Sequence, residues 1–255
     1  MKRSSIFLLI CMLLVGSISI TAAQDKKPKF KALAIAEIGG GHAAFDTAAV
    51  IWLNKLAADS NFTIDYIHDT KTINKKLLKK YGLFIQLDYP PYPWEKEAQD
   101  AFIDYMENGK GGWVGFHHPT LLGVFDDYPM WQWYSAFMGD IMFKAHIPGG
   151  TTATMHVEDP VHPVMKGLPA SFTTRDEWYI YNQSPRPKVH VLASIDEATY
   201  VPDKPVKMGD HPVVWTNQNI KARNIYIAMG HFPQLFGDAN FTRLVTNAIF
   251  WATPK

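Results

Sequence analysis

The chain has 255 residues, of which 47% are hydrophobic and 13% aromatic, enough for one well-packed core or two small ones. Lysine and arginine number 25, aspartate and glutamate 24, so the charges nearly balance. Nucleic-acid binding normally requires a basic stripe, and this composition argues against a nucleic-acid partner.

The first 23 residues have the pattern of a bacterial signal peptide. A basic start at 1–3 precedes an apolar run at 6–15 and small residues at 21–23. Because this run is short for a membrane span, we expect cleavage after residue 23, no membrane anchor afterwards, and secretion to the periplasm. Cys11, the only cysteine, lies in this leader, so we expect a mature chain without a disulfide or a thiol nucleophile.

The first half of the mature chain alternates short apolar runs with segments of helical periodicity. This alternation is typical of an α/β fold with a doubly wound, mostly parallel sheet flanked by helices. A glycine turn at 39–41 separates the first strand from the first helix, as at the opening of such a sheet. The predicted strands are 31–37, 62–67, 83–87 and 112–116, and the predicted helices are 44–58, 72–80 and 94–107.

The pattern changes after residue 139, where no good helix separates the next strands. An antiparallel extension around 150–216 is therefore expected, with strands at 151–157, 176–181, 189–194 and 212–216. A buried strand at 224–229 and a helix at 239–252, with Asp238 as its N-cap, restore the first pattern. Since no repeat or long linker interrupts the chain, we expect one domain over residues 28–255.

Three histidines follow predicted strands of the parallel sheet. His42 comes after the first strand, His117 after the fourth in GFHHPT, and His231 after the last in MGHFP. In open α/β sheets ligands bind outside the carboxyl ends of the strands. A single histidine there more often caps a loop, whereas three at equivalent places favour a shared site. Surface or packing positions are expected for His146, His156, His190 and His211.

The adjacent pair Asp176 and Glu177 can supply a carboxylate to this site. Neighbouring side chains of a strand point to opposite faces, so one of the two can face the histidines, with Glu177 the first choice. Three neutral imidazoles and one carboxylate can form a zinc-type shell with a position open for water or substrate. Candidate ligands of such a divalent metal are His42, His117, His231 and Glu177. Without a metal, the same groups could serve as acid and base.

Five motifs occur in a fixed order along residues 31–251. They are GGGHAAF, GFHHPT, HPVMKGLPASFTTRDEWY, HPVVW followed by NIYIAMGHF, and FTRLVTNAIFWA. Together they resemble the ThuA-like, or trehalose-utilisation, family. The resemblance implies a class I glutamine amidotransferase-like fold, of the flavodoxin-like kind. It also implies a sugar-modifying enzyme of disaccharide metabolism that works through keto-sugar intermediates, with a bound divalent metal.

The same resemblance singles out His117. Amidotransferases of this fold carry a cysteine nucleophile at the strand-to-helix elbow that corresponds to this histidine. With no cysteine in the mature chain, glutamine hydrolysis through a thioester is excluded. His118 stands where the family usually has a small residue, which alters the expected shape of the elbow pocket.

Two functional hypotheses follow, both with a small-molecule carbohydrate as partner. The first is an enzyme that transfers a proton next to a carbonyl or hydrolyses a sugar, with His117 and His231 as its central pair. Its catalytic carboxylate would be Glu177 or Asp176. The second is a non-catalytic carbohydrate-binding or accessory protein of a glycan-utilisation system.

Substrate contacts are expected from side chains next to the central pair. These are His42, His118, Trp178 and Tyr179. The rings of Trp131, Trp133 and Trp178 could also form an apolar wall on which a sugar stacks, although ordinary core packing explains them equally well.

Overall fold

The computed structural model describes residues 27–37 and 39–254. The predicted signal peptide, residues 1–23, lies outside the described residues. Within the described ranges, no helix combines the length and the apolar character that crossing a membrane requires.

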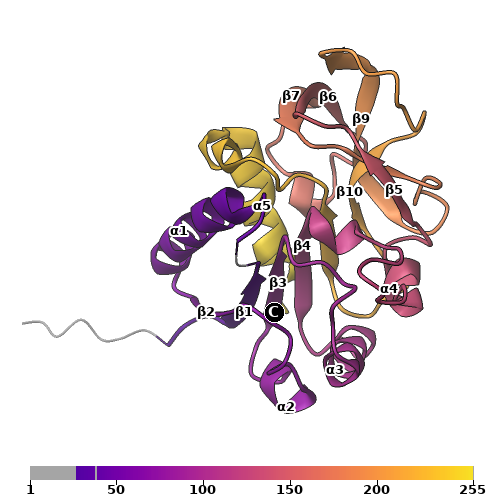
Figure 1. Cartoon of the computed structure of the whole chain (residues 1–255). Coiled ribbons are helices and arrows are strands. Elements are labelled where there is room, and N and C mark those ends of the chain that lie inside the picture. Colours follow the sequence, from indigo (N-terminus) through magenta and orange to yellow (C-terminus); the bar gives the residue numbers. More distant parts are fainter. Residues whose placement is uncertain (1–26, 38, 255) are drawn as a thin grey trace, which may run out of the picture.

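A nine-stranded sheet organises the described chain (Figure 1). Five neighbouring strands are parallel: β2 (Thr63–Ile67), β1 (Lys31–Ala36), β3 (Leu83–Leu87), β4 (Gly112–Phe116) and β11 (Asn224–Ile227). The sheet continues with antiparallel pairing through β10 (Pro212–Thr216), β9 (His190–Val201), β6 (Thr151–Val157) and β7 (Ser171–Asp176). A separate antiparallel pair joins β5 (Phe143–His146) to β8 (Tyr179–Tyr181).

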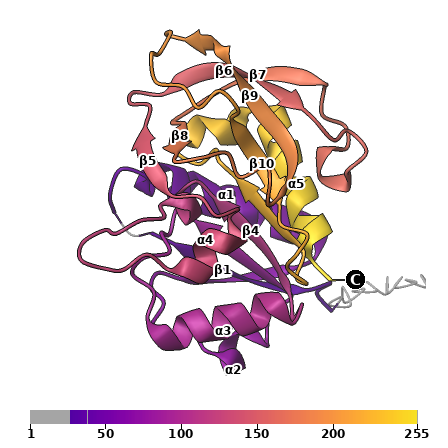
Figure 2. The same ribbon diagram turned by 90° about the vertical axis from the view of Figure 1, so that its right-hand side faces the viewer.

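Helices cover both faces of the parallel strands (Figure 1). On one side lie α1 (Ala43–Ser60) and α5 (Ala239–Ala252), and on the other α2 (Lys75–Leu78), α3 (Lys96–Glu107) and α4 (Gln132–Phe137). Because both faces are covered, every residue of β3, β4 and β11 is buried. Buried and partly exposed residues instead alternate along β6, as in a strand of an antiparallel sheet with one solvent-exposed face. Figure 2, turned by 90°, shows the antiparallel strands above the parallel part of the sheet.

The predicted α/β architecture is confirmed, including the antiparallel extension and the N-cap of the last helix. The side chain of Asp238 accepts hydrogen bonds from the backbone N–H groups of Asn240 and Phe241. The predicted helix at 72–80 is reduced to the four residues of α2, which begin after an Asn74 cap. The predicted strand at 189–194 continues to Val201, and α4 and β5 were not predicted.

One difference bears directly on the site. The predicted strand 176–181 is broken at Glu177 and Trp178, where β7 ends and β8 begins. The strand β7 pairs with β6 in the large sheet, whereas β8 pairs with β5. The break therefore lies where the chain passes from one sheet to the other.

Candidate functional site

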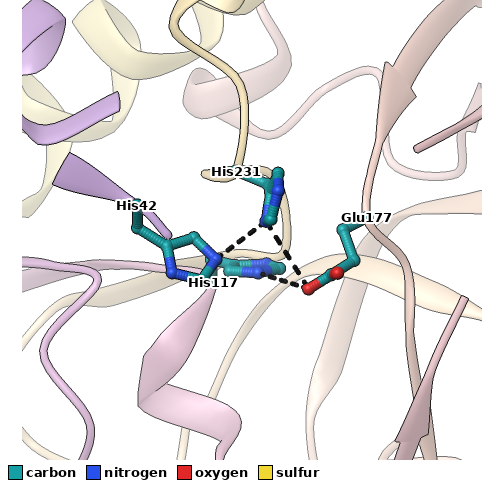
Figure 3. A group of neighbouring side chains, drawn as sticks. All are labelled: His42, His117, Glu177 and His231. Atoms are coloured by element: carbon teal, nitrogen blue, oxygen red, sulfur yellow. Dashed lines mark hydrogen bonds and ion pairs between the residues drawn. The ribbon is translucent and has the colours of Figure 1, made fainter. Parts of the chain in front are cut away.

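Four side chains predicted to share a site converge at the carboxyl edge of the parallel strands (Figure 3). His42 is the N-cap residue of α1, His117 directly follows β4, and His231 follows β11. Glu177 reaches the same point from the break between β7 and β8. One potential ligand atom of each residue lies within 4.8 Å of those of the others.

The contacts between these atoms are short. Glu177 Oε2 lies 3.4 Å from His117 Nε2 and 3.5 Å from His231 Nδ1. His231 Nδ1 is 2.8 Å from His42 Nε2. Ligand atoms bound to a tetrahedral zinc at about 2.0–2.1 Å are separated from one another by about 3.3 Å. The two distances to Glu177 lie close to that separation, whereas His231 and His42 are at hydrogen-bond distance and would move apart by about 0.5 Å to bind one ion.

The backbone of His117 forms a sharp elbow. Its φ of 56° and ψ of −85° are rare for a residue with a Cβ, and such strain persists only where neighbours enforce it. The His117 N–H donates to the carbonyl of Ile227 at 3.0 Å. The His117 carbonyl accepts from the hydroxyls of Thr120 at 3.0 Å and Tyr226 at 2.9 Å. These three hydrogen bonds hold the elbow and thereby aim the imidazole at the site.

The tautomer of His117 follows from its hydrogen bonds. Nδ1 lies 3.0 Å from the carbonyl of Ala228 and must carry the hydrogen, because a carbonyl only accepts. Nε2 then presents a lone pair toward the site. This atom is buried and has no hydrogen-bond partner among the described residues. Burial also lowers the pKa of His117 to about 4, which keeps the ring neutral. A buried lone pair of this kind is suited to a cation or a proton donor.

The charge states of the other three residues are complementary. Burial and the neighbouring imidazoles of His118, His117 and His231 lower the pKa of His42 to about 2. Burial opposes ionisation of Glu177, but the adjacent His117 ring and a hydrogen bond with His231 outweigh it and hold the pKa of this carboxyl well below its usual range. The same hydrogen bond to Glu177 raises the pKa of His231. Neutral His42 and His117 beside an ionised carboxylate suit a divalent metal, which would have to displace the proton that Glu177 favours on His231.

Asp176 does not face the cluster. The structure therefore corrects the prediction that Asp176 is an alternative to Glu177 as the catalytic carboxylate. Its side chain is fully buried and accepts from the backbone N–H groups of Glu177 at 2.7 Å, Gly230 at 2.8 Å and His231 at 3.1 Å. Burial raises the pKa of Asp176 to about 7, against the effect of these hydrogen bonds. Asp176 therefore ties the Glu177 segment to the His231 loop and acts as a positioning residue.

Of the three tryptophans predicted as a sugar-binding wall, Trp131 and Trp178 are buried in the core and Trp133 is partly buried against it. Trp178 is 0% exposed and donates Nε1–H to the carbonyl of Thr151 at 2.8 Å, so its ring has no face free for a substrate. Trp131 packs on Trp94 between α3 and α4, and Trp133 donates to Glu107 at 2.7 Å. The prediction that Trp178 contacts substrate is therefore wrong in this structure, because the sheet crossover turns the ring inward.

A different set of rings extends from the cluster. Tyr179, predicted to contact substrate, lies with its ring centroid 4.2 Å from that of His117 and is almost fully buried. The ring of Phe143 meets Tyr179 edge to face at 4.9 Å, and Phe125 follows at 6.1 Å. The series ends on Tyr92 and the exposed Tyr128. We call these five rings the aromatic strip.

His146 belongs to the site although the sequence placed it on the surface or in packing. Its Nε2 lies 3.7 Å from Glu177 Oε1, and half of its side chain is exposed. The contact arises because β5 pairs with β8, which sets His146 opposite Tyr179. No local motif marks this long-range pairing. Of the other histidines in that group, His156 is exposed, while His190 and His211 pair with Asp159 and Glu197.

His118 lies beside the cluster rather than beneath it. Its ring centroid is 4.0 Å from that of His42, and its Nδ1 lies 3.6 Å from Glu37 Oε2. Glu37 itself was not predicted as a site residue. Its only signal in the sequence is its place as the last residue of the first apolar run.

Comparisons with known proteins agree with the motifs. The sequence matches the family model described as ThuA, trehalose utilisation, over residues 31–252. It is similar to a ThuA-like protein of known structure from Bacteroides uniformis, with 34% identity, a TM-score of 0.79, and coverage of 91% of this chain and 94% of that one. A ThuA-like protein from Parabacteroides merdae is 20% identical, with a TM-score of 0.66 and coverage of 89% and 90%.

More distant similarity extends to the glutaminase domain of the CTPS of Trypanosoma brucei. That domain is 7% identical, with a TM-score of 0.50 and coverage of 86% of this chain and 94% of that one, and it shares the fold alone. No curated protein matches the chain.

Proposed function

The chain belongs to the ThuA family, as its motifs predicted, and we propose that it is an enzyme that acts on a disaccharide or a keto-sugar formed from one. The observation that carries the proposal is the convergence of His42, His117, His231 and Glu177 at the edge of the sheet where α/β proteins bind ligands. The family description, trehalose utilisation, supports a sugar as the substrate.

In this proposal the four side chains hold a divalent metal, with zinc the best match. Imidazole nitrogens and a carboxylate oxygen are common zinc ligands, and the unpartnered Nε2 of His117 fits that role. The hydrogen bond from His117 Nδ1 to Ala228 is the outer contact that fixes a ligand histidine in its ring orientation. When bound, such an ion acts as a Lewis acid that polarises a carbonyl or activates water.

The chain's own residues account for the movement of protons. Glu177 is ionised, and its Oε1 is the oxygen on the side of His146. Its low pKa makes it a weak base, so in this proposal Glu177 orients His146, and His146 accepts the proton from the carbon next to a sugar carbonyl. Imidazole both takes and gives protons near neutral pH, and the half-exposed His146 can exchange them with water. Proton transfer next to a carbonyl is therefore the step that these residues serve best.

The aromatic strip supplies a surface for the sugar that is not reacting. Sugar rings stack on aromatic faces, and Phe125 and Tyr128 lie on the outer part of the strip, away from His117. A disaccharide with one ring at the metal ligands would place its second ring toward these side chains. The substrate class is accordingly a disaccharide rather than a single sugar.

A turnover assay with matched variants tests the function. Trehalose, other disaccharides and their 3-keto forms are incubated with the zinc-loaded protein, with His117→Ala, and with His156→Ala as an exposed histidine control. We expect conversion of at least one keto-disaccharide, a loss of about 10²–10³-fold in His117→Ala, and no change in His156→Ala.

Two results would contradict the proposal. If no sugar is converted while binding is measurable, the protein is a carbohydrate-binding or accessory protein. If His117→Ala keeps full turnover, the chemistry lies elsewhere in the molecule.

A further inference from the structure

One arginine beside the cluster is held in place by an aromatic ring and a backbone carbonyl. Arg175 lies in β7 directly before Asp176, and its side chain is exposed. Its guanidinium carbon lies 4.4 Å from the centre of the Phe232 ring, and its Nη2 donates to the carbonyl of Gly149 at 2.9 Å. A planar guanidinium stacks well on an aromatic face. The two contacts together fix Arg175 in one orientation.

The turn before β6 packs tightly against this arginine. Gly150 has a φ of 70°, and a Cβ added there would lie 2.6 Å from the Phe232 ring and 2.8 Å from Arg175 Nη2. A glycine is needed for the backbone to approach both groups so closely. In the same turn, the carbonyl of Pro148 accepts a hydrogen bond from Lys204 Nζ at 3.3 Å. The turn therefore brings two positive charges together.

The chain does not pair either of these charges with a carboxylate. Within the part of the chain that the structure describes, neither Arg175 nor Lys204 forms an ion pair, whereas Arg186 forms two. The hydrogen bond to the turn occupies one of the five N–H donors of Arg175. The remaining donors form a planar fork that fits two oxygens of a carboxylate or a phosphate. An arginine held in this way is suited to an anionic group of a ligand.

Arg175 is also close to the proposed metal ligands. The Phe232 ring under its guanidinium meets the imidazole of His231, with ring centroids 4.5 Å apart. A hydrogen bond with Glu177 raises the pKa of His231, and the charge of Arg175 opposes that rise, so Arg175 is near enough to act on the ring. The aromatic strip begins at a different member of the cluster, His117. A ligand at the cluster can therefore meet the strip and Arg175 through different groups.

We propose that Arg175 binds an anionic group, a carboxylate or a phosphate ester, on the sugar that occupies the cluster. This inference rests on the proposed function, because it specifies which disaccharides the same site takes. Lys204 adds positive charge on the same turn, which attracts an anion from solution. The substrate class is accordingly an acidic disaccharide, with its charged group on the reacting sugar and its second ring on the aromatic strip.

Binding of matched sugars tests the proposal. Trehalose and the other disaccharides of the turnover panel are each compared in three forms, in which C6 of one ring carries a hydroxyl, is oxidised to a carboxylate, or carries a phosphate ester. Calorimetry measures their affinities for the zinc-loaded wild type, Arg175→Gln and Arg175→Lys. Thermal unfolding of each variant confirms that it is folded.

The matched control is Arg223→Gln. Arg223 is likewise an exposed arginine that lies over an aromatic ring and donates to a backbone carbonyl, both of them in Trp251. It directly precedes β11, so it lies at the opposite end of this strand from His231.

We expect the wild type to bind an acidic form about 10–100-fold more tightly than the neutral form. Arg175→Gln should remove most of this preference and leave the affinity for the neutral form unchanged. Arg175→Lys should keep part of the preference, since lysine retains the charge but lacks the planar fork. Arg223→Gln should bind as the wild type does. Added salt should weaken binding of the acidic form more than binding of the neutral form.

The outcomes separate this inference from the proposed function. A preference for the carboxylate or for the phosphate ester, lost in Arg175→Gln, supports the inference and identifies the anion. Equal affinity for all three forms overturns the inference and keeps the proposed function, as does a preference that Arg175→Gln leaves unchanged. An acidic form that binds through Arg175 but is not converted supports the inference and contradicts the proposed enzyme. If no form of any disaccharide binds, both are overturned.

Discussion

Gly230 tests how the elbow positions His117. A Cβ added at Gly230 would lie 2.7 Å from the Cβ of His117, 3.0 Å from Oδ1 of Asp88 and 3.4 Å from the Cβ of Phe116. Carbon atoms pack best at about 3.5–4.0 Å, so the closest contact is roughly 1 Å too short. Gly230→Ala should therefore push the backbone of β4 and the His117 ring away from the His231 loop.

The expected cost of this overpacking is about 1–3 kcal/mol in the free energy of unfolding. For a chain of this length, that corresponds to a fall of roughly 2–12 °C in the melting temperature. Because the displaced ring is a proposed metal ligand, the affinity for zinc should also fall about 10–100-fold. Thermal unfolding of the metal-free protein and zinc titration measure the two effects separately.

Gly237→Ala is the matched control, since a Cβ at that position meets nothing within 4 Å. It should leave both the melting temperature and the affinity for zinc unchanged. If Gly230→Ala behaves like this control, the close packing of the His231 loop on the elbow does not position His117, and the reasoning is refuted.

Three further changes probe the surroundings of the site. Tyr226→Phe removes a hydrogen bond to the His117 carbonyl and should lower the free energy of unfolding, measured in urea, by about 0.5–1.5 kcal/mol. An unchanged urea midpoint would show that the elbow does not depend on this hydrogen bond. Trp178→Phe removes the hydrogen bond to the Thr151 carbonyl of β6 and should lower the free energy of unfolding by about 1–3 kcal/mol. Sugar binding, measured by calorimetry, should stay the same. Weaker binding at unchanged stability would instead show that Trp178 contacts the sugar. Burial opposes ionisation of Glu197, but hydrogen bonds from His211 and two backbone N–H groups outweigh it and lower its pKa. Its stabilising effect is thus present above the unfolded pKa of about 4.5 and is lost as the pH falls through the folded pKa. Glu197→Gln should accordingly lower stability more at pH 7 than at pH 3, and equal losses at both pH values would contradict this.

The parallel half of the fold and the position of the site could be predicted from the sequence. Strands buried on both faces appear as short continuous apolar runs, such as LFIQL in β3 and GWVGF in β4. A histidine after the end of such a strand must lie at the carboxyl edge, whatever the details of the loops. This is why His42, His117 and His231 could be placed together before any coordinates were known.

Residues that enter the site through the antiparallel strands could not be placed in the same way. The segment DEWYIY, 176–181, was predicted as one strand, but Asp176 ends β7 and Tyr179–Tyr181 form β8, which belong to different sheets. The crossover turns Trp178 into the core and Glu177 toward the histidines. His146 reaches Glu177 only because β5 pairs with β8, and that pairing leaves no local pattern in the sequence.

Two buried carboxylates near Glu37, those of Asp46 and Asp88, could not be placed from the sequence for the same reason. Asp46 lies in the first turn of α1 and would be expected to interact with the helix N-terminus, while Asp88 follows β3 before a proline-rich turn. Only the packing of α1 against the ends of the strands brings both close to Glu37. Their proximity to Glu37 therefore emerges from the structure alone.

The most direct measurement is a crystal of the protein grown with zinc and recorded on both sides of the zinc absorption edge. The four-residue site predicts an anomalous peak about 2.0–2.2 Å from His42 Nε2, His117 Nε2, His231 Nδ1 and an oxygen of Glu177. If the four side chains are ordered around a region without such a peak, and His117 Nε2 instead accepts a hydrogen bond from water, these residues do not form a metal site.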